Sequence, residues 1–195
     1  MTNNVGSTPS STPSRSDAPS HIYYFDVGAG TWHGEFTFRV TSWDRFRNTA
    51  GIGLLNRALV VAMALTQRLT GAARLESTIV ANPSAGAFGV ADNVVRISKF
   101  GVTLYLMKER YVLAPDGRGV TVEANEQYTP VPRILARKFT YPAEIRPSGM
   151  ESVYHLPVLG SPWTATYQVA ADRQSLMGEL VCDWAKATET ARRVS

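Results

Sequence analysis

After Gly71 the chain consists almost entirely of short segments in which apolar and polar residues alternate, separated by turn residues. Side chains of a strand point alternately to its two faces, so this pattern predicts strands with one face in a core. Gly, Pro, Asp and Ser between the segments are typical of hairpin turns, which produce an antiparallel meander. A meander of eight or more strands tends to close into a barrel, because closure removes the exposed edges. The expected strands are 74–82, 93–100, 102–114, 120–129, 133–146, 152–159, 163–171 and 175–184.

One strand and two helices are expected before this meander. From Thr31 to Val40, aromatic and small residues alternate with polar ones. Gly34 within this strand indicates a close approach by a ligand or by another backbone. Thr41 or Ser42 is placed to cap a short helix, and a second helix is expected from Leu54 to Thr70.

The second helix is apolar on more than one side. Residues spaced by three and four positions predict one buried stripe, made of Leu55, Leu59, Ala62, Leu65 and Leu69. The opposite face is apolar as well, with Val60, Met63 and Ala64. Such a helix is either buried on two sides or exposes a patch for a partner or a membrane.

The two ends of the chain differ in composition from the middle. Residues 1–20 are rich in Ser, Thr and Pro and are expected to form a disordered tail before a single barrel domain over 21–195. The tail lacks the apolar stretch of a secretory signal, so none is expected. The final segment, 183–195, is rich in alanine and predicts a short C-terminal helix, with a last strand as the alternative.

Charge and cysteine content narrow the range of functions. The net charge of +4 comes from scattered basic residues, so binding to nucleic acid is not expected. Cys182 is the single cysteine, which rules out an intramolecular disulfide and favours a reducing compartment such as the cytoplasm. It lies in an apolar run, which indicates a buried inert thiol more than a nucleophile. The three histidines are widely spaced, so neither a metal site nor a cofactor is expected.

Two motifs near the start resemble a known superfamily. Gly30-Thr31-Trp32 resembles the G-x-W that opens the first strand of calycins, which include lipocalins and fatty-acid-binding proteins, and its extension through Gly34 also resembles nitrobindin-type heme barrels. The segment Ser42–Arg57 resembles the helix-turn-helix that covers the barrel of intracellular fatty-acid-binding proteins. The resemblance spans residues 26–70. It implies a mainly β fold, a single antiparallel calycin-like β-barrel with a two-helix lid after the first strand.

The chain also departs from these families. The Arg-x-Tyr pair that holds a carboxylate in the last strand of fatty-acid-binding proteins has no counterpart in 175–193. A fatty acid held by its carboxylate is therefore not implied. A heme is not implied either, because His155 is the only histidine in a late strand and an ordinary strand position explains it better.

The alternating aromatic residues are the candidate ligand-binding set. They are Trp32, Phe36, Phe38, Tyr105, Met107, Tyr111, Trp163 and Tyr167. The sequence leaves open which face of strand 102–113 points inward. Tyr and Trp carry polar groups that need partners when buried, which favours a ligand with both rings and oxygen atoms. The competing interpretation is that these side chains simply fill the barrel as an ordinary core.

Three functions compete at this point. The first is intracellular binding of a small hydrophobic ligand that enters past the helices. The second is a cyclase or isomerase acting on a polyketide-like or isoprenoid-like substrate in the same cavity, with Glu109, Tyr105, Tyr111 and His155 as catalytic candidates. The third is an interaction module in which the 54–69 helix meets a partner or, transiently, a membrane surface. A monomer or a homodimer is expected in each case.

Overall fold

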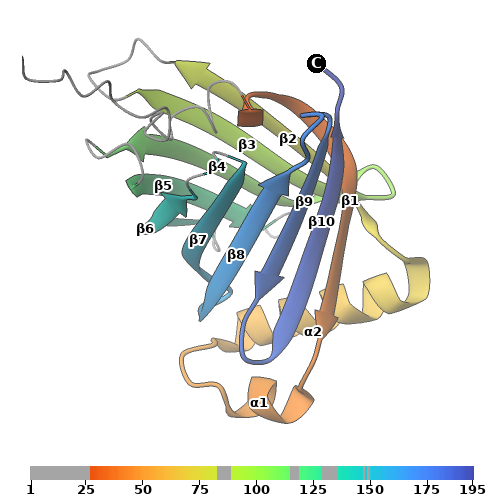
Figure 1. Ribbon diagram of the computed structural model, residues 1–195. Helices are drawn as coiled ribbons and strands as arrows, with labels where there is room; N and C mark the ends of the chain where they lie inside the picture. Colours follow the sequence, from red (N-terminus) through yellow and green to blue (C-terminus); the bar gives the residue numbers. More distant parts are fainter. Residues whose placement is uncertain (1–26, 83–88, 115–118, 129–135, 147, 149) are drawn as a thin grey trace, which may run out of the picture.

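Ten antiparallel strands close into one barrel, and two helices lie across one end of it (Figure 1). The computed structural model describes residues 27–82, 89–114, 119–128, 136–146, 148 and 150–195, so the expected N-terminal tail lies outside the described residues. Each strand pairs with its neighbours in the chain, and the last strand pairs with the first. The elements are β1 (Gly30–Val40), α1 (Trp43–Asn48), α2 (Leu54–Thr70), β2 (Ala73–Asn82), β3 (Val90–Lys99), β4 (Val102–Leu113), β5 (Gly119–Tyr128), β6 (Arg137–Ile145), β7 (Glu151–Val158), β8 (Ser161–Val169), β9 (Ser175–Val181) and β10 (Ala185–Arg193).

The predicted mainly β fold, with a closed antiparallel barrel and two helices after the first strand, is confirmed. The predicted C-terminal helix is wrong, because Ala185–Arg193 is strand β10. This strand pairs with β1 from Trp32↔Arg193 to Val40↔Ala185 and with β9 on its other side. The ladder hydrogen bonds on both sides, and the closure that they produce, outweigh the helix preference of its alanines.

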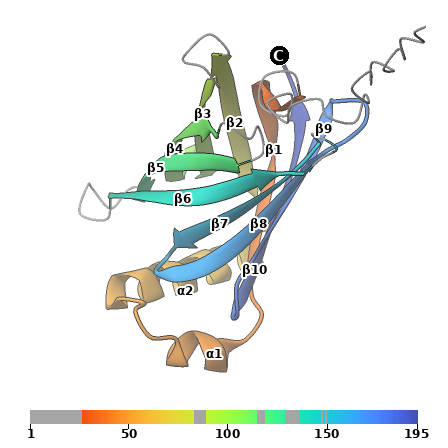
Figure 2. The same ribbon diagram turned by 60° about the vertical axis from the view of Figure 1, so that its left-hand side comes forward.

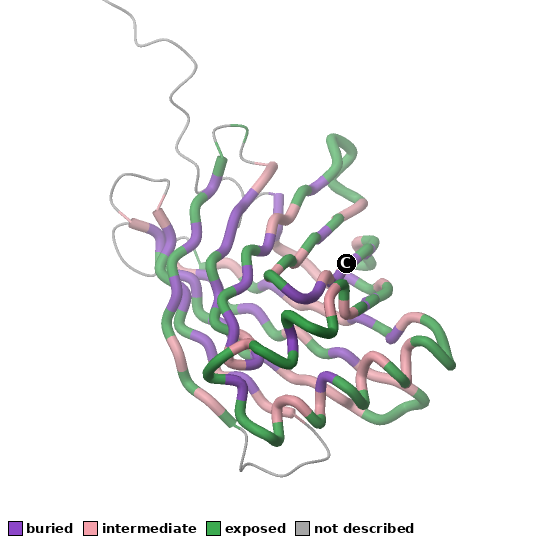
Figure 3. Tube along the Cα trace, turned by 90° about the horizontal axis from the view of Figure 1, so that it is seen from below, coloured by how far each residue is buried: buried purple, intermediate pink, exposed green. Residues whose placement is uncertain are grey.

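Burial alternates along the strands as the sequence pattern requires. Figure 3 looks from the end where the helices lie and shows buried and exposed residues in turn along the strands. On β4 the buried positions are Met107, Glu109, Tyr111 and Leu113, which settles the face that points inward. The β3–β4 turn is a two-residue hairpin turn, in which Phe100 has a φ of 51°.

Gly34 is required by the closure of the barrel. A Cβ built there would lie 1.8 Å from the Thr190 carbonyl oxygen and 2.6 Å from the Ala191 Cα of β10. The close approach that this glycine predicts is therefore an approach by another backbone. Any larger residue would push β1 and β10 apart where the barrel closes.

Helix α1 is fixed to the rim of the barrel. Ser42 caps it as expected, accepting a hydrogen bond from Arg45 N at 3.3 Å. Phe46 of α1 packs on Trp184, with the ring centroids 4.8 Å apart, and Thr41 N donates to the Trp184 carbonyl at 2.8 Å. These contacts hold α1 in place from the β9–β10 turn.

Helix α2 crosses the same end of the barrel and rests on it by a narrow face (Figure 2). Val60 is its one buried residue. The predicted buried stripe meets the barrel in part: Leu59 and Ala62 line the cavity, whereas Leu55, Leu65 and Leu69 are 42%, 51% and 81% exposed. The barrel end offers one contact surface, so the rest of the apolar surface of α2 stays in solvent. In the described part of the chain, no helix is long and apolar enough to cross a membrane.

Candidate ligand-binding cavity

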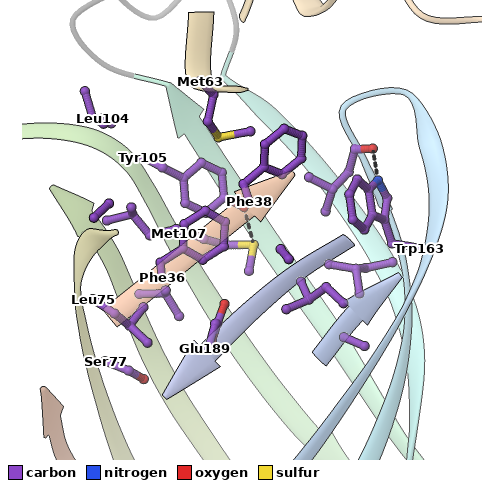
Figure 4. A pocket seen from close by; sticks show the side chains of 18 of the residues that line it. Phe36, Phe38, Met63, Leu75, Ser77, Leu104, Tyr105, Met107, Trp163 and Glu189 are labelled. Atoms are coloured by element: carbon purple, nitrogen blue, oxygen red, sulfur yellow. Dashed lines mark hydrogen bonds between the residues drawn. The ribbon is translucent and has the colours of Figure 1, made fainter. Parts of the chain in front are cut away.

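A cavity of about 520 Å³ lies inside the barrel beneath α2. Figure 4 shows aromatic and aliphatic side chains from several strands pointing into it, with Met63 of α2 above them. The cavity is within the size range of small-molecule sites. All eight residues of the predicted binding set line it, namely Trp32, Phe36, Phe38, Tyr105, Met107, Tyr111, Trp163 and Tyr167. The interior is therefore partly hollow and is not an ordinary packed core.

The end of the barrel opposite the helices is closed by Trp32. Its side chain is 1% exposed, and its indole N–H donates to the Gly28 carbonyl at 2.9 Å. The Arg193 guanidinium lies 4.7 Å from the ring centroid and donates to the Val27 carbonyl. The G-x-W tryptophan thus forms both the inner wall of the cavity and the closed end of the barrel.

Polar groups gather across the middle of the barrel in what we call the polar belt: Ser77, Asn93, Glu109, Tyr111, Tyr141, Tyr167 and Glu189. Its centre is the buried carboxyl of Glu109. Asn93 Nδ2 and the Tyr111 hydroxyl donate to Glu109 Oε2 at 2.9 and 2.7 Å, and the Tyr141 hydroxyl donates to Oε1. Burial raises the pKa of Glu109, and these three hydrogen bonds only partly offset the rise.

A second buried carboxyl, Glu189 of β10, belongs to the same belt. It is 7% exposed and pairs in register with Phe36 of β1. Burial raises its pKa to about 7, with a smaller contribution from the charge of Glu109, whereas a hydrogen bond with Tyr167 lowers it. A carboxyl of this kind exchanges its proton near neutral pH.

Gly178 makes room for the contact between Tyr167 and Glu189. A Cβ at this position would lie 2.5 Å from Tyr167 Cε1 and 3.2 Å from the Glu189 Cβ. The tyrosine ring therefore lies across β9, where any side chain would displace it. Its other face meets Tyr154 edge-on, with the centroids 5.3 Å apart.

Between the polar belt and α2 the walls are apolar and aromatic. Tyr105 and Tyr128 pack there with centroids 5.2 Å apart, and the Tyr105 hydroxyl donates to Met107 Sδ at 3.0 Å. Beside them, Arg137 forms an ion pair with the fully buried Glu126 at 2.9 Å. The cavity thus has an apolar part under α2 and a polar part at mid-barrel.

The structure separates the four catalytic candidates. Glu109 and Tyr111 are hydrogen-bonded in the polar belt, and Tyr105 lines the apolar part of the cavity. His155 is exposed on the outer face of β7, where its Nδ1 lies 3.5 Å from Thr164 Oγ1, so it does not reach the cavity. Its neighbour Tyr154 points inward, on the face of β7 that also carries Leu156.

Four members of the polar belt were missed by the sequence analysis, namely Ser77, Asn93, Tyr141 and Glu189, and so was Tyr154, which also lines the cavity. Tyr154 is detectable, because the alternation that includes Leu156 puts it on the apolar face of its strand and His155 on the other. Glu189 was hidden by the interpretation of its segment as a helix. Nothing local in the sequence distinguishes an inward Tyr141 that bonds a carboxyl from a tyrosine that only packs.

The single cysteine takes no part in the cavity chemistry. Cys182 is half-buried in the β9–β10 turn, and burial raises the pKa of its thiol, which disfavours the nucleophilic thiolate. Among the described residues, no group of three or more His, Cys, Asp or Glu side chains is arranged to hold a metal ion.

No family model matches the chain, and no curated protein matches it. The protein belongs to a structural class: a closed ten-stranded antiparallel β-barrel with two helices over one end, consistent with a calycin-like fold. Its interior contains a largely apolar cavity with two buried carboxyl groups.

Proposed function

We propose that this protein is a calycin-like carrier or sensor that binds a small hydrophobic, aromatic or oxygenated ligand inside the barrel. The observation that carries the proposal is the cavity of about 520 Å³. Small barrels either fill their interior with side chains or hold one small ligand there, and this interior is not filled. Tyrosine hydroxyls beside aliphatic walls suit a ligand that has both apolar rings and a polar group.

The ligand enters past α2 in this proposal. The helix buries a single residue, and its carboxyl end is held by Lys99 Nζ, which donates to the carbonyls of Thr70 at 2.8 Å and Gly71 at 3.1 Å. Few buried apolar contacts favour local opening at low free-energy cost. α1, fixed by Trp184, stays in place while α2 moves.

Binding is tested with N-phenyl-1-naphthylamine, an uncharged fluorescent probe, and with native mass spectrometry of protein purified from its own host. We expect saturable binding at one site and a retained small molecule. Ala187→Phe places a ring in the cavity, so the affinity should fall at least about tenfold. Thr190→Phe, at an exposed position of the same strand, is the matched control. Equal binding by both variants, or none by the unmodified protein, would contradict the proposal.

A second candidate function is supported by the pKa of Glu189, which lies at about 7. A buried acid that titrates near neutral pH suits general acid–base chemistry, such as cyclisation or isomerisation of a bound ligand. Small molecules retained by the unmodified protein and by Glu189→Gln distinguish the two functions. A carrier retains the same compound in both, in a smaller amount where Glu189 contributes to affinity. An enzyme that uses Glu189 as its acid or base accumulates a different compound, the unconverted substrate, in the variant.

We also propose that α2 touches membrane surfaces transiently when the ligand is exchanged. Leu54, Leu65 and Leu69 are 86%, 51% and 81% exposed on its outer face. Arg68 in the last turn and Arg47 on α1 add positive charge at the same end of the molecule. Apolar residues flanked by arginine favour a bilayer that contains anionic lipid.

A further inference from the structure

We propose that the ligand is an organic cation, an apolar body that ends in a protonated amine, and that Glu189 is its counter-ion. This inference rests on the proposed binding function and specifies the chemistry of the ligand. It follows from the charges that line the cavity, from the spare bonding capacity of one carboxyl group, and from the aromatic rings that surround it.

The charged groups around the cavity differ in sign and in whether they are already paired with other groups of the protein. Among the described residues that line it, the charged side chains are Glu109, Glu189 and Lys99. Lys99 is committed to the end of α2, where its ammonium group donates to three backbone carbonyls, those of Thr70, Gly71 and Ala72. The groups inside the barrel that remain available to a ligand are therefore acidic.

Two further described cations near the interior, Arg137 and Arg193, do not line the cavity. Arg137 donates to Glu126 Oε2 through two nitrogens, at 2.9 and 3.2 Å, and to the Pro157 carbonyl at 3.0 Å. Arg193 lies against Trp32 at the closed end of the barrel. Among the described residues that line the cavity, a carboxylate ligand would meet two acidic groups and no cation other than the already paired Lys99, at a high electrostatic cost.

The two carboxyl groups differ in their remaining capacity for hydrogen bonds. Glu109 accepts from Asn93, Tyr111 and Tyr141, so both of its oxygens are in use. Among the described residues, Tyr167 is the hydrogen-bond partner of Glu189. In Figure 4 the side chain of Glu189 stands among the residues that line the cavity. Glu189 therefore has room to accept hydrogen bonds from a ligand.

Aromatic rings surround this carboxyl. Phe36 lies opposite Glu189 across the β1–β10 ladder, and Tyr167 contacts it over Gly178. The faces of such rings attract cations, most strongly when water is excluded. An ammonium group beside Glu189 would thus be paired with a carboxylate and shielded by rings, while its apolar body occupies the space under α2.

Three probes with the same alkyl chain separate this inference from simple hydrophobic binding. Decylamine, 1-decanol and decanoate are compared at pH 7 by displacement of N-phenyl-1-naphthylamine. A buried hydrogen bond to a charged group is strong, so decylamine should bind about ten- to a hundredfold more tightly than decanol. Decanoate should bind most weakly. Glu189→Gln should remove the preference for the amine, so that the variant binds decylamine and decanol with similar affinities.

Glu35→Gln is the matched control, because Glu35 is exposed on the outer face of β1 and should not alter any of the three affinities. Equal affinities for amine and alcohol in the unmodified protein would overturn the inference, as would the tightest binding by decanoate. In both cases decanol still binds, so the carrier function itself stands. A Glu189→Gln variant that folds and keeps the amine preference would also overturn it. Failure of all three probes and of the dye would overturn the carrier function together with the inference.

Discussion

The buried carboxyl of Glu189 makes the stability of this protein depend on pH in a direction opposite to that of most acidic side chains. Burial raises its pKa in the folded state from 4.5 to about 7. The folded protein therefore binds a proton here that the unfolded chain releases. The contribution to stability is fully present below pH 4.5 and is lost as the pH rises through 7.

The size of this effect follows from the same two values. Each pKa unit corresponds to about 1.4 kcal/mol, so a rise from 4.5 to about 7 amounts to about 3 kcal/mol. Glu189→Gln keeps the size of the side chain and removes the titration. Between pH 4.5 and pH 8, the free energy of unfolding should fall by about 3 kcal/mol more in the unmodified protein than in the variant.

Urea unfolding, followed by tryptophan fluorescence at several pH values, measures this difference. The pKa of Glu109 is also raised, but that residue is present in both proteins, so most of its contribution cancels in the comparison. Glu35→Gln, on the outer face, should follow the unmodified protein. If the free energy of unfolding varied with pH in the same way for the unmodified protein and Glu189→Gln, the argument that burial raises the pKa of Glu189 would be refuted.

Three further outcomes are expected. Gly178→Ala should lower the free energy of unfolding by about 1–3 kcal/mol in urea titrations, because the added methyl collides with a tyrosine ring; an unchanged value would show that the ring is free to move. In hydrogen exchange, the amides of α2 should exchange faster than those of the strands, and Lys99→Met should accelerate them further; uniform protection of α2 would argue against entry there. Replacing Leu65 and Leu69 by Gln should abolish co-sedimentation with vesicles that contain anionic lipid, whereas unmodified protein that never sediments would exclude the membrane contact.

The strands of the barrel were predictable because apolar and polar residues alternate within each strand, which the sequence of that strand alone shows. The barrel wall separates two environments, so each strand shows a period of two in its own residues. The Phe100-Gly101 turn is also determined locally, since a two-residue turn of type I′ requires positive φ at both positions and glycine adopts it easily. The two helices were also predictable from the sequence, because Ser42 caps α1 and glycines lie on either side of α2.

The errors arose where the partner of a segment decides its structure. The last strand contains alanines whose helix preference is overcome only by pairing with β1 and β9 on its two sides. For α2, the spacing of leucines identified an apolar face but not which of two apolar faces meets the barrel. The structure places Met63 together with Leu59 and Ala62 over the cavity, and the strands that they cover are far away in the sequence.

The polar belt indicates that the barrel interior is not shaped by stability alone. Two buried carboxyl groups with raised pKa values lower the stability of the fold near neutral pH, and well-packed apolar residues in their place would avoid this cost. Such a conflict with local stability is typical of functional sites. Gly178 supports the same conclusion, since it has no side chain of its own to pack and gives Tyr167 access to Glu189. Both proposed functions, the carrier and the acid–base enzyme, use these carboxyl groups in the cavity. In a carrier, Glu189 gives up its proton when a cationic ligand binds beside it. In an enzyme, Glu189 transfers its proton to a ligand that reacts.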